Sequence, residues 1–410
     1  MSAAETAPKP SRWHVALRQI TTGGAAISVL SVVLALIAGS VLIAITNESV
    51  QSAAGYFFAR PMDTVAAVWD AVSGAYAALF RGAVFNPNAS GFAAQIRPLT
   101  ESLKFATPLI AAGLGVGLAF RAGLFNIGGQ GQMLMAAAGA GYVGAYLDLP
   151  VGLHLLVAVV AGVVAGGIWA GIAGYLKART GAHEVILTIM LNNIALYLLA
   201  WMLATQGILQ APGSNNPKTA PMAETALLPN LLGDRFNLHA GFILALVAVA
   251  FTWWLLERSS LGFRLRAVGE NPHAARAAGI SVSRSYVIVM VIAGGLVGVA
   301  GVSQVLGTVP TGFGGDIDAG MGFDAITVAL LGRSSPIGIL GAGILFGAFK
   351  AGGFSMQAAE QVPNEVVLVV QSLIVLFIAA PPLVRAIFRL PDPAQPRARK
   401  RGRHAKAVTV

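Results

Sequence analysis

The sequence predicts an all-α polytopic membrane protein with about ten transmembrane helices. Of its 410 residues, 56% are apolar and 11% are charged, whereas a soluble domain carries about 25% charged residues. A soluble fold of this size would lack the polar surface it needs in water. The 49 glycines are typical of closely packed membrane helices. The absence of cysteine excludes disulfides, thiolate catalysis and cysteine metal sites.

Nine stretches without Asp, Glu, Lys or Arg are each long enough for one span, because a bilayer core about 30 Å thick needs roughly 20 helical residues. These stretches are 19–47, 105–120, 122–147, 149–176, 185–217, 236–256, 285–315, 334–349 and 366–384. The second and eighth need extra turns from their flanks. A tenth apolar segment, 322–332, is too short for a regular span, so we expect a broken or half-helix there.

Lysine and arginine predict the orientation. With the N-terminus in the cytoplasm and alternating spans, 20 of the 27 basic residues lie inside. The seven left outside are Arg60, Arg81, Arg97, Lys104, Lys218, Arg235 and Lys350. Both termini are then cytoplasmic and the number of crossings is even, which fits ten and not nine. We expect a cytoplasmic tail over 1–22, a transmembrane domain over 23–388 and a basic cytoplasmic tail over 389–410.

Both ends of the chain allow a second interpretation. The basic run from Arg397 to Lys406 could bind nucleic acid, but we favour a juxtamembrane segment that touches anionic lipid, and we expect no nucleic-acid partner. Residues 25–45 could be the apolar region of a signal peptide. That segment is too long and no clear cleavage site follows it, so we expect a retained first helix.

Two regions are expected on the outer side. Residues 48–98 carry apolar side chains at three-and-four spacing between Val65 and Phe80, which predicts an amphipathic helix on the outer interface. The turn Asn86-Pro87-Asn88 is expected to end it. Residues 207–239 contain four prolines and are expected to form a second outer loop.

The chain contains a diverged internal repeat. Its first copy reads Gly131–Gly139, Pro150–Gly152 and Glu184–Ile186, and its second reads Gly322–Leu330, Pro336–Gly338 and Glu365–Val367. On the predicted topology the first copy starts inside and the second outside. Inverted repeats of this kind are typical of transporters, with the solute near the midplane. Chance similarity between glycine- and alanine-rich helices is the alternative.

The motif search excludes several kinds of chemistry. There is no GxxxxGK[ST] loop, no HExxH motif and no GxSxG motif, so the chain is not itself a P-loop ATPase. Residues 139–144 match GxGxxG, but the match lies inside an apolar span and indicates small-residue packing. No charged residue lies in the middle of the long spans, which weakens the interpretation of the chain as a proton- or cation-coupled pump.

Neutral amides do enter the predicted spans. Asn126, Gln130 and Gln132 surround a glycine-broken helix start, and Asn192 and Asn193 lie within the fifth span. Amides both donate and accept hydrogen bonds, which suits an uncharged, hydroxyl-rich solute better than an ion. Hydrogen bonding between helices is the alternative.

The cytoplasmic loop 258–284 encodes a short helix with both ends marked. Asn271 is the expected N-cap, Pro272 the first helical residue and Gly279 the C-terminal stop. We expect Ala274, Ala275 and Ala278 to offer a partner a surface of close approach. A loop helix that merely packs on the bundle is the alternative.

These residues resemble a known family. Gly269–Ile280 is similar to the G-x-N-x-x-A-A-x-x-A-G-I coupling loop of ATP-binding-cassette importer permeases for ribose-type sugars and branched-chain amino acids. Phe120–Gly128, Gly131-Gln132 and Glu184–Asn192 resemble the nucleoside and simple-sugar branch. The resemblance covers residues 100–385. Members of this branch often have an acidic residue where Gln130 stands.

The resemblance implies a permease subunit that catalyses no bond chemistry and holds no cofactor itself. Its implied partners are a homologous permease, in a heterodimer, two cytoplasmic ATPases that bind ATP and Mg, and an external solute-binding lipoprotein. The implied location is the bacterial cytoplasmic membrane. We therefore expect an importer subunit for nucleosides, with simple sugars second. A stand-alone ion- or proton-coupled transporter or channel is the main alternative, and an intramembrane enzyme lacks paired catalytic residues.

Overall fold

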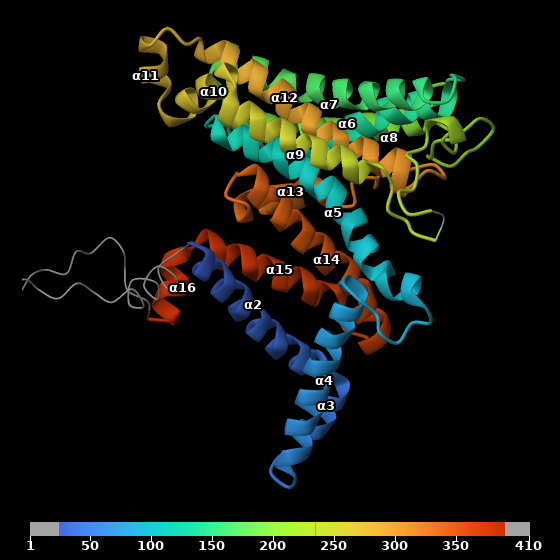
Figure 1. Ribbon diagram of the computed structural model, residues 1–410, viewed down its shortest axis with the longest axis vertical. Helices are drawn as coiled ribbons and strands as arrows, with labels where there is room; N and C mark the ends of the chain where they lie inside the picture. Colours follow the sequence, from blue (N-terminus) through green and yellow to red (C-terminus); the bar gives the residue numbers. More distant parts are fainter. Residues whose placement is uncertain (1–23, 234, 390–410) are drawn as a thin grey trace, which may run out of the picture. The chain divides into compact units, whose positions relative to one another are not determined.

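The computed structural model describes residues 24–233 and 235–389, and helices dominate it (Figure 1). Within those residues, β-structure is limited to two isolated bridges, Gln206–Gln210 and Asn230–His239. The predicted tail 1–22 and all of the predicted tail 389–410 except Arg389 lie outside the described residues. The predicted all-α class is confirmed.

Seven helices in the described part of the chain are long and apolar enough to cross a membrane, so this is a multi-pass membrane protein. They are α2 (Gly24–Thr46), α5 (Phe92–Arg121), α7 (Leu153–Thr180), α8 (Glu184–Leu203), α9 (Gly241–Arg258), α12 (Val282–Ser303) with its π-helical extension η2 (Gln304–Thr308), and α14 (Pro336–Glu360).

The other three predicted segments are also helical. They form α6 (Gly129–Tyr146), the expected half-helix α13 (Met321–Leu331) and α15 (Asn364–Ala379), followed by α16 (Pro381–Ile387). None of these is among the seven helices that meet the length and hydropathy requirement. The total of ten crossings therefore stays a prediction.

The described residues divide into two compact units, one of residues 24–41 with 369–389 and the other Leu42–Leu368. Helix α5 is central to the larger unit. The sequence predicted a short span at 105–120, but the helix begins at Phe92 and continues through Pro98 and Pro108. Every residue from Ala106 to Ala119 is buried, and the helix packs against α12 and α14. Small residues permit this packing, because a Cβ on Gly117 would lie 2.6 Å from Ile339 Cδ1.

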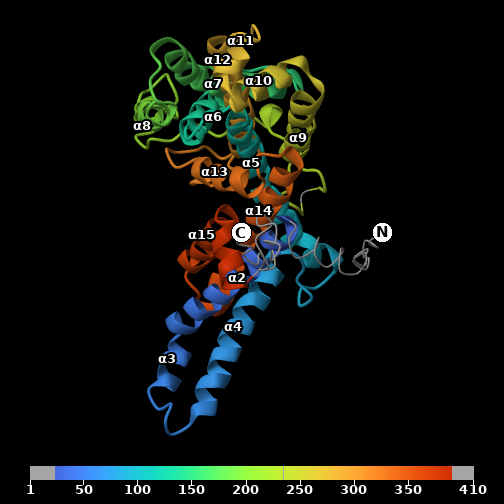
Figure 2. The same ribbon diagram turned by 90° about the vertical axis from the view of Figure 1, so that its left-hand side faces the viewer.

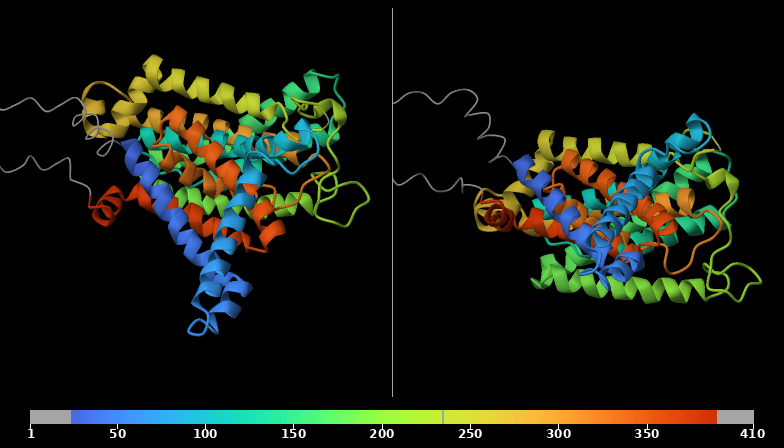
Figure 3. Two further views of the ribbon diagram at one scale, coloured as in Figure 1. Left: turned by 60° about the horizontal axis from the view of Figure 1, so that its bottom comes forward. Right: turned by 90° about the horizontal axis from the view of Figure 1, so that it is seen from below.

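Helix α8 differs from α5 because one face carries exposed apolar side chains, and Figures 2 and 3 show it at an edge of the bundle. That face consists of Ile186, Met190, Ile194, Tyr197 and Trp201. Helix α7 has a similar exposed row, Leu156, Val160, Val164, Ile168 and Ile172. A spacing of four residues, with one step of three on α8, places each row on one side of its helix. Such faces suit lipid or another membrane subunit.

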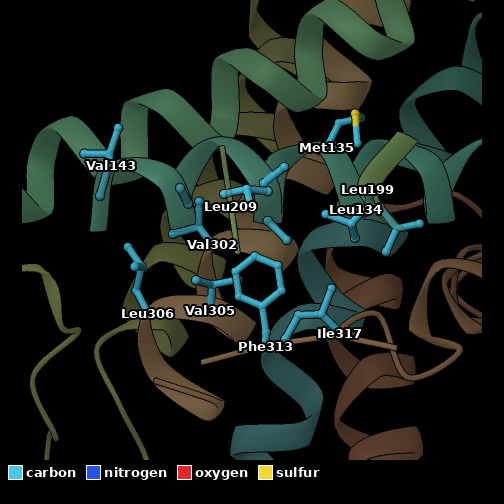
Figure 4. Packing of buried hydrophobic residues seen from close by; sticks show 14 of the residues in the cluster. Leu134, Met135, Val143, Leu199, Leu209, Val302, Val305, Leu306, Phe313 and Ile317 are labelled. Carbon is cyan, nitrogen blue, oxygen red and sulfur yellow. The ribbon is translucent and has the colours of Figure 1, made fainter. Parts of the chain in front are cut away.

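An apolar cluster holds the loop 309–320 against the helices (Figure 4). Phe313 is 1% exposed and packs among Val305, Leu306 and the α6 and α8 side chains Leu134 and Leu199. Gly141 on α6 leaves room for its ring, since a Cβ there would overlap the ring. Ile317, from the same loop, belongs to the cluster. The burial of both side chains fixes the loop just before α13.

The predicted outer insert is helical, but it ends at a different residue from the one predicted. It contains α3 (Glu48–Ala54) and α4 (Pro61–Ala83), which lie side by side in Figure 2. Because α5 begins at Phe92, the last seven residues predicted for the insert, 92–98, continue a long helix instead. Alanines form the buried face of α4, which packs on α14, whereas the predicted apolar residues Val65, Trp69 and Phe80 are exposed. Its place on the outer interface stays a prediction.

In its described residues, 207–233 and 235–239, the predicted loop is largely irregular and contains one short 3-10 helix, η1 (Glu224–Ala226). His239 ends this loop, is 1% exposed and lies against η2. Its Nδ1 accepts the Gly241 N–H at 3.2 Å, so Nε2 carries the proton and faces Thr308 Oγ1 at 3.2 Å. This neutral ring ties the loop to the segment that leads into 309–320.

Candidate functional site

The connection between α5 and α6 is irregular backbone within a helical bundle. Helix α5 ends at Arg121 and α6 begins at Gly129, as the glycine-broken pattern predicted. Gly123 has φ 75, a left-handed conformation that glycine adopts without a Cβ penalty. A helix start exposes unpaired N–H groups, so side chains must satisfy those that are buried.

Asn126 and Gln132 form a reciprocal amide pair at this helix start. Asn126 Oδ1 accepts from Gln132 Nε2 at 3.0 Å and from the Gly128 N–H at 2.9 Å. Asn126 Nδ2 donates to Gln132 Oε1 at 3.3 Å. The two residues are 0% and 1% exposed, so their amides are engaged with each other and with the broken backbone.

Asn192 and Thr188 join α8 to the same connection. Asn192 Oδ1 accepts the Gly131 N–H at 2.8 Å, and its Nδ2 donates to the Ile127 carbonyl at 2.9 Å. Thr188 Oγ1 accepts the Ile127 N–H at 3.4 Å. We call Asn126, Gln132, Asn192 and Thr188 the amide network. Among its three amides, Asn192 joins α8 to α6, whereas Asn126 and Gln132 join the connection to the α6 start. Contact of these amides with solute stays a prediction.

The structure separates the other two predicted path residues from this network. Asn193 is exposed on α8, and its Nδ2 donates to the Ile189 carbonyl of its own helix at 3.0 Å. Gln130 is half-buried at the other side of the α6 start, where its side chain lies beside the Asp318 carboxylate. The five predicted amides therefore occupy three different environments.

Gln130 belongs to a second polar group, the acidic cluster, which we define as Gln130, Asp318, Asp324 and Lys350. Asp318 is 5% exposed, and its Oδ2 atom is buried without a hydrogen-bond partner. Lys350 Nζ lies 3.7 Å from Asp324 Oδ2 and donates to the Ala319 carbonyl at 3.2 Å. The cluster thus joins α6, the end of loop 309–320, α13 and α14.

The starts of α6 and α13 touch each other between these two groups. A Cβ on Gly129 would lie 2.6 Å from the Gly322 carbonyl oxygen, and a Cβ on Gly322 would overlap the Gln130 backbone. These helices begin the two copies of the predicted repeat, and each is followed by two more helices, α7–α8 and α14–α15. The element order agrees with a repeat, and its inverted relation stays a prediction.

The loop after α9 contains two helices, α10 (Ser260–Glu270) and α11 (Pro272–Ala277). The expected cap is present, because Asn271 Oδ1 accepts from the N–H groups of His273 at 3.0 Å and Ala274 at 3.1 Å. Gly279, with φ 82, follows the helix end as expected. Local signals thus fixed α11, while α10 was not foreseen.

The predicted docking alanines, Ala274 and Ala275 in α11 and Ala278 at its C-cap, do not share one surface. Ala274 and Ala278 are exposed, as expected for a docking face. Ala275 is 3% exposed and packs with Val268 and Val282 in a small apolar cluster. Ala275 therefore does not add to the exposed surface of this loop, and the docking role of the predicted residues stays a prediction.

Gly269 connects this loop to the site. It lies in α10 against the α5–α6 connection, where a Cβ on Gly123 would be 3.1 Å from Gly269 Cα. A Cβ on Gly269 itself would overlap the Arg121 carbonyl. Two backbones therefore touch directly, so a displacement of α10 reaches the segment that holds Asn126. The sequence offered Gly269 as a motif residue and gave no indication of this contact.

Sequence reasoning missed Asp318, Asp324 and Lys350. Charged residues were sought in the middle of the long spans, but these three lie elsewhere. Asp318 lies in a loop and Asp324 in the half-helix α13, and Lys350 of α14 was predicted to lie outside the membrane. A signal was present, because Asp324 is the one acidic residue of the apolar segment 322–332. In the described residues, no group of three or more His, Cys, Asp or Glu could hold a metal ion.

Residues 99–379 match the family model described as "Branched-chain amino acid transport system / permease component". The chain is 36% identical to the guanosine ABC transporter permease protein NupP of Bacillus subtilis over 88% of this chain and 94% of that protein.

Two further relatives match shorter parts. The glucose ABC transporter permease protein TsgB13 of Haloferax volcanii is 36% identical over 68% of this chain and 75% of its own length. The nucleoside ABC transporter permease protein NupB of Lactococcus lactis is 35% identical over 69% of this chain and 79% of its own length. No solved structure matches.

Proposed function

This chain belongs to the family of branched-chain amino acid transport system permease components, and we propose that its solutes are nucleosides, with related simple sugars second. As a member it is the transport subunit of an ATP-binding-cassette importer and not an enzyme. The observation that carries the nucleoside proposal is its similarity along most of its length to a permease named for guanosine. The relative named for glucose supports the second choice.

The family implies association with an ATPase and with a solute-binding partner. More specifically, we propose a heterodimer with a homologous permease, two cytoplasmic ATPases that bind ATP and Mg, and an external lipoprotein. The exposed apolar faces of α7 and α8 offer surfaces for a second membrane subunit or for lipid. The bias of basic residues supports cytoplasmic termini. The family and its bacterial relatives support a place in a bacterial cytoplasmic membrane.

The proposed movement begins at α11. Its exposed Ala274 and Ala278 can approach an ATPase closely, whereas the buried Ala275 anchors α11 to Val268 on α10. The contact between Gly269 and Gly123 then transmits a shift of α10 to the α5–α6 connection. Coupling of this kind needs a continuous chain of packed groups, and these residues provide one from the loop to the amide network.

The solute path is proposed to open where α6 and α13 touch. Asn126, Gln130, Gln132 and Asn192 lie at or beside that junction, whereas Asn193 faces away on α8. The amide network keeps the α6 start intact while the junction changes. Gln130 and the acidic cluster provide the polar groups that are not all satisfied.

One observation favours the alternative of a stand-alone proton-coupled transporter. Buried carboxylates such as Asp318 are common in proton pathways through membranes. A membrane vesicle that contains this chain, the second permease, the ATPase and the binding protein separates the two. We expect guanosine uptake that requires internal ATP and is competed by other nucleosides. Competition by glucose without competition by nucleosides would overturn the nucleoside proposal.

A further inference from the structure

The acidic cluster contains a polar atom that the protein leaves without a partner. Asp318 Oδ2 is fully enclosed, and no described group hydrogen-bonds it. Enclosing an ionised carboxylate is costly unless its oxygens are paired. The carboxylate lies beside the Gln130 side chain and the Gly320 backbone, while its Oδ2 oxygen remains without a hydrogen-bond donor.

The backbone around Asp318 fixes this position. Ala319 has φ 44 and Gly320 has φ 76, two successive left-handed residues. A non-glycine residue in this region is strained, and the Lys350 ammonium contributes to holding it through the Ala319 carbonyl at 3.2 Å. Immediately upstream, Ile317 is buried in the apolar cluster, and its carbonyl accepts from Gln304 Nε2 at 3.4 Å. The chain is thus tied on both sides of Asp318.

The position of Asp318 relative to the α6–α13 junction suggests what its free oxygen binds. It lies three residues before α13 and contacts Gln130 at the start of α6. Asp324 and Lys350 keep side-chain exposures of 33% and 24%, so the cluster reaches from enclosed carboxylate to accessible surface. A solute that enters this junction meets Asp318 with Gln130 beside it.

We propose that Asp318 is a specificity-determining residue whose free carboxylate oxygen accepts hydrogen bonds from adjacent hydroxyl groups of the solute, those of a ribose ring. A carboxylate accepts from two neighbouring hydroxyls at once, and acidic side chains bind ribose hydroxyls in dinucleotide-binding folds. The Gln130 amide can donate to a hydroxyl oxygen or accept from its proton. This inference rests on the proposed transport of nucleosides or sugars.

The test compares Asp318→Asn with the matched variant Asp316→Asn, an exposed carboxylate two residues away. Asparagine preserves the shape of the side chain and keeps one oxygen that can accept the Gly320 N–H, but it removes the negative charge. Uptake is measured in the assembled complex with guanosine, 2′-deoxyguanosine, 3′-deoxyguanosine and inosine. We expect Asp318→Asn to lower guanosine uptake about tenfold, because a hydrogen bond to a charged group is lost. The substitution should leave the uptake of one deoxyguanosine nearly unchanged, namely the one that lacks the hydroxyl bound by Asp318. Asp316→Asn should behave as wild type.

Three results would overturn the proposal while wild-type nucleoside uptake is intact. An equal loss for all four solutes would indicate a structural role for Asp318, and a changed guanosine-to-inosine ratio alone would indicate recognition of the base. Normal guanosine uptake by Asp318→Asn would remove the role altogether. If the wild-type complex imports no nucleoside, the proposed function fails instead, and the same comparison with glucose and its 2-deoxy and 3-deoxy forms tests Asp318 independently.

Discussion

Two polar regions meet at the start of α6, and they differ in how completely their hydrogen bonds are satisfied. In the amide network, the oxygens of Asn126 and Asn192 accept backbone N–H groups, and Asn126 pairs with Gln132. In the acidic cluster, Asp318 Oδ2 has no partner. Asp318 is buried like the amides of the network, so burial alone does not separate a structural role from a binding role.

The difference shows which polar residues of a membrane bundle are available to a ligand. A satisfied amide network stabilises irregular backbone, and an incoming solute would have to displace hydrogen bonds that already exist. A carboxylate with a free oxygen loses nothing when a donor arrives. We therefore assign positioning to the amide network and solute contact to the acidic cluster, with Gln130 next to both.

The largest effect is expected where the two regions share a contact. Gly322→Leu places a side chain on the Gln130 backbone and should push α13 away from α6. Because both regions depend on this approach, uptake should fall about 100-fold, as misplacement by about 1 Å can do in other sites. The control is Gly341→Leu in α14, where nothing lies within 4 Å. Equal uptake by the two variants would show that the junction does not matter.

Two substitutions at the predicted docking alanines test whether the ATPase acts on the amide network through α11. Ala278 is exposed, so Ala278→Trp should leave the protein folded while uptake per ATP hydrolysed falls about tenfold, a usual size for coupling between sites. Ala275 is 3% exposed, so Ala275→Trp should instead reduce the amount of folded protein. Uptake, ATP hydrolysis and membrane content are measured together. Intact coupling in Ala278→Trp would remove α11 as the docking helix.

Asn126→Leu tests the structural role of the amide network. It leaves the Gly128 N–H and the Gln132 amide buried and unpaired, which should destabilise the protein by about 3 kcal/mol, since each unpaired group costs roughly 1–3 kcal/mol. Thermal unfolding of the purified complex measures this, and uptake of all nucleosides should fall together. Asn193→Leu, on the exposed face of α8, is the control. A selective change in solute preference would assign Asn126 to the binding region instead.

A further effect concerns pH and the contact between His239 and η2, which leads into the loop that carries Asp318. Burial lowers the pKa of His239 from its usual 6.5 to about 4, and the nearby Lys104 charge adds to this. The folded protein therefore keeps the ring neutral while the unfolded chain takes up a proton below pH 6.5. Stability should be full above pH 6.5 and lower by about 2 kcal/mol at pH 5. His239→Gln should flatten this dependence in thermal unfolding, and an unchanged slope would contradict it.

The parts predicted correctly from sequence are those with local causes. Asn271, Pro272 and Gly279 mark the ends of α11 within nine residues, and hydropathy located helices for all ten apolar segments. The proximity of Gln130 and Asp318 brings together residues far apart in sequence, and no local pattern indicates it. The burial of Ala275 likewise depends on Val268 and Val282. Helix positions follow from the chain itself, whereas partners across the bundle follow from packing.

The most direct test of the proposed importer function is to measure which energy source drives transport by the purified protein in vesicles. The chain alone should import no guanosine under a proton or sodium gradient. The complete complex should import it when ATP is enclosed on the ATPase side, and an ionophore should not reduce that uptake. Gradient-driven uptake by the chain alone, abolished by the ionophore, would contradict the account.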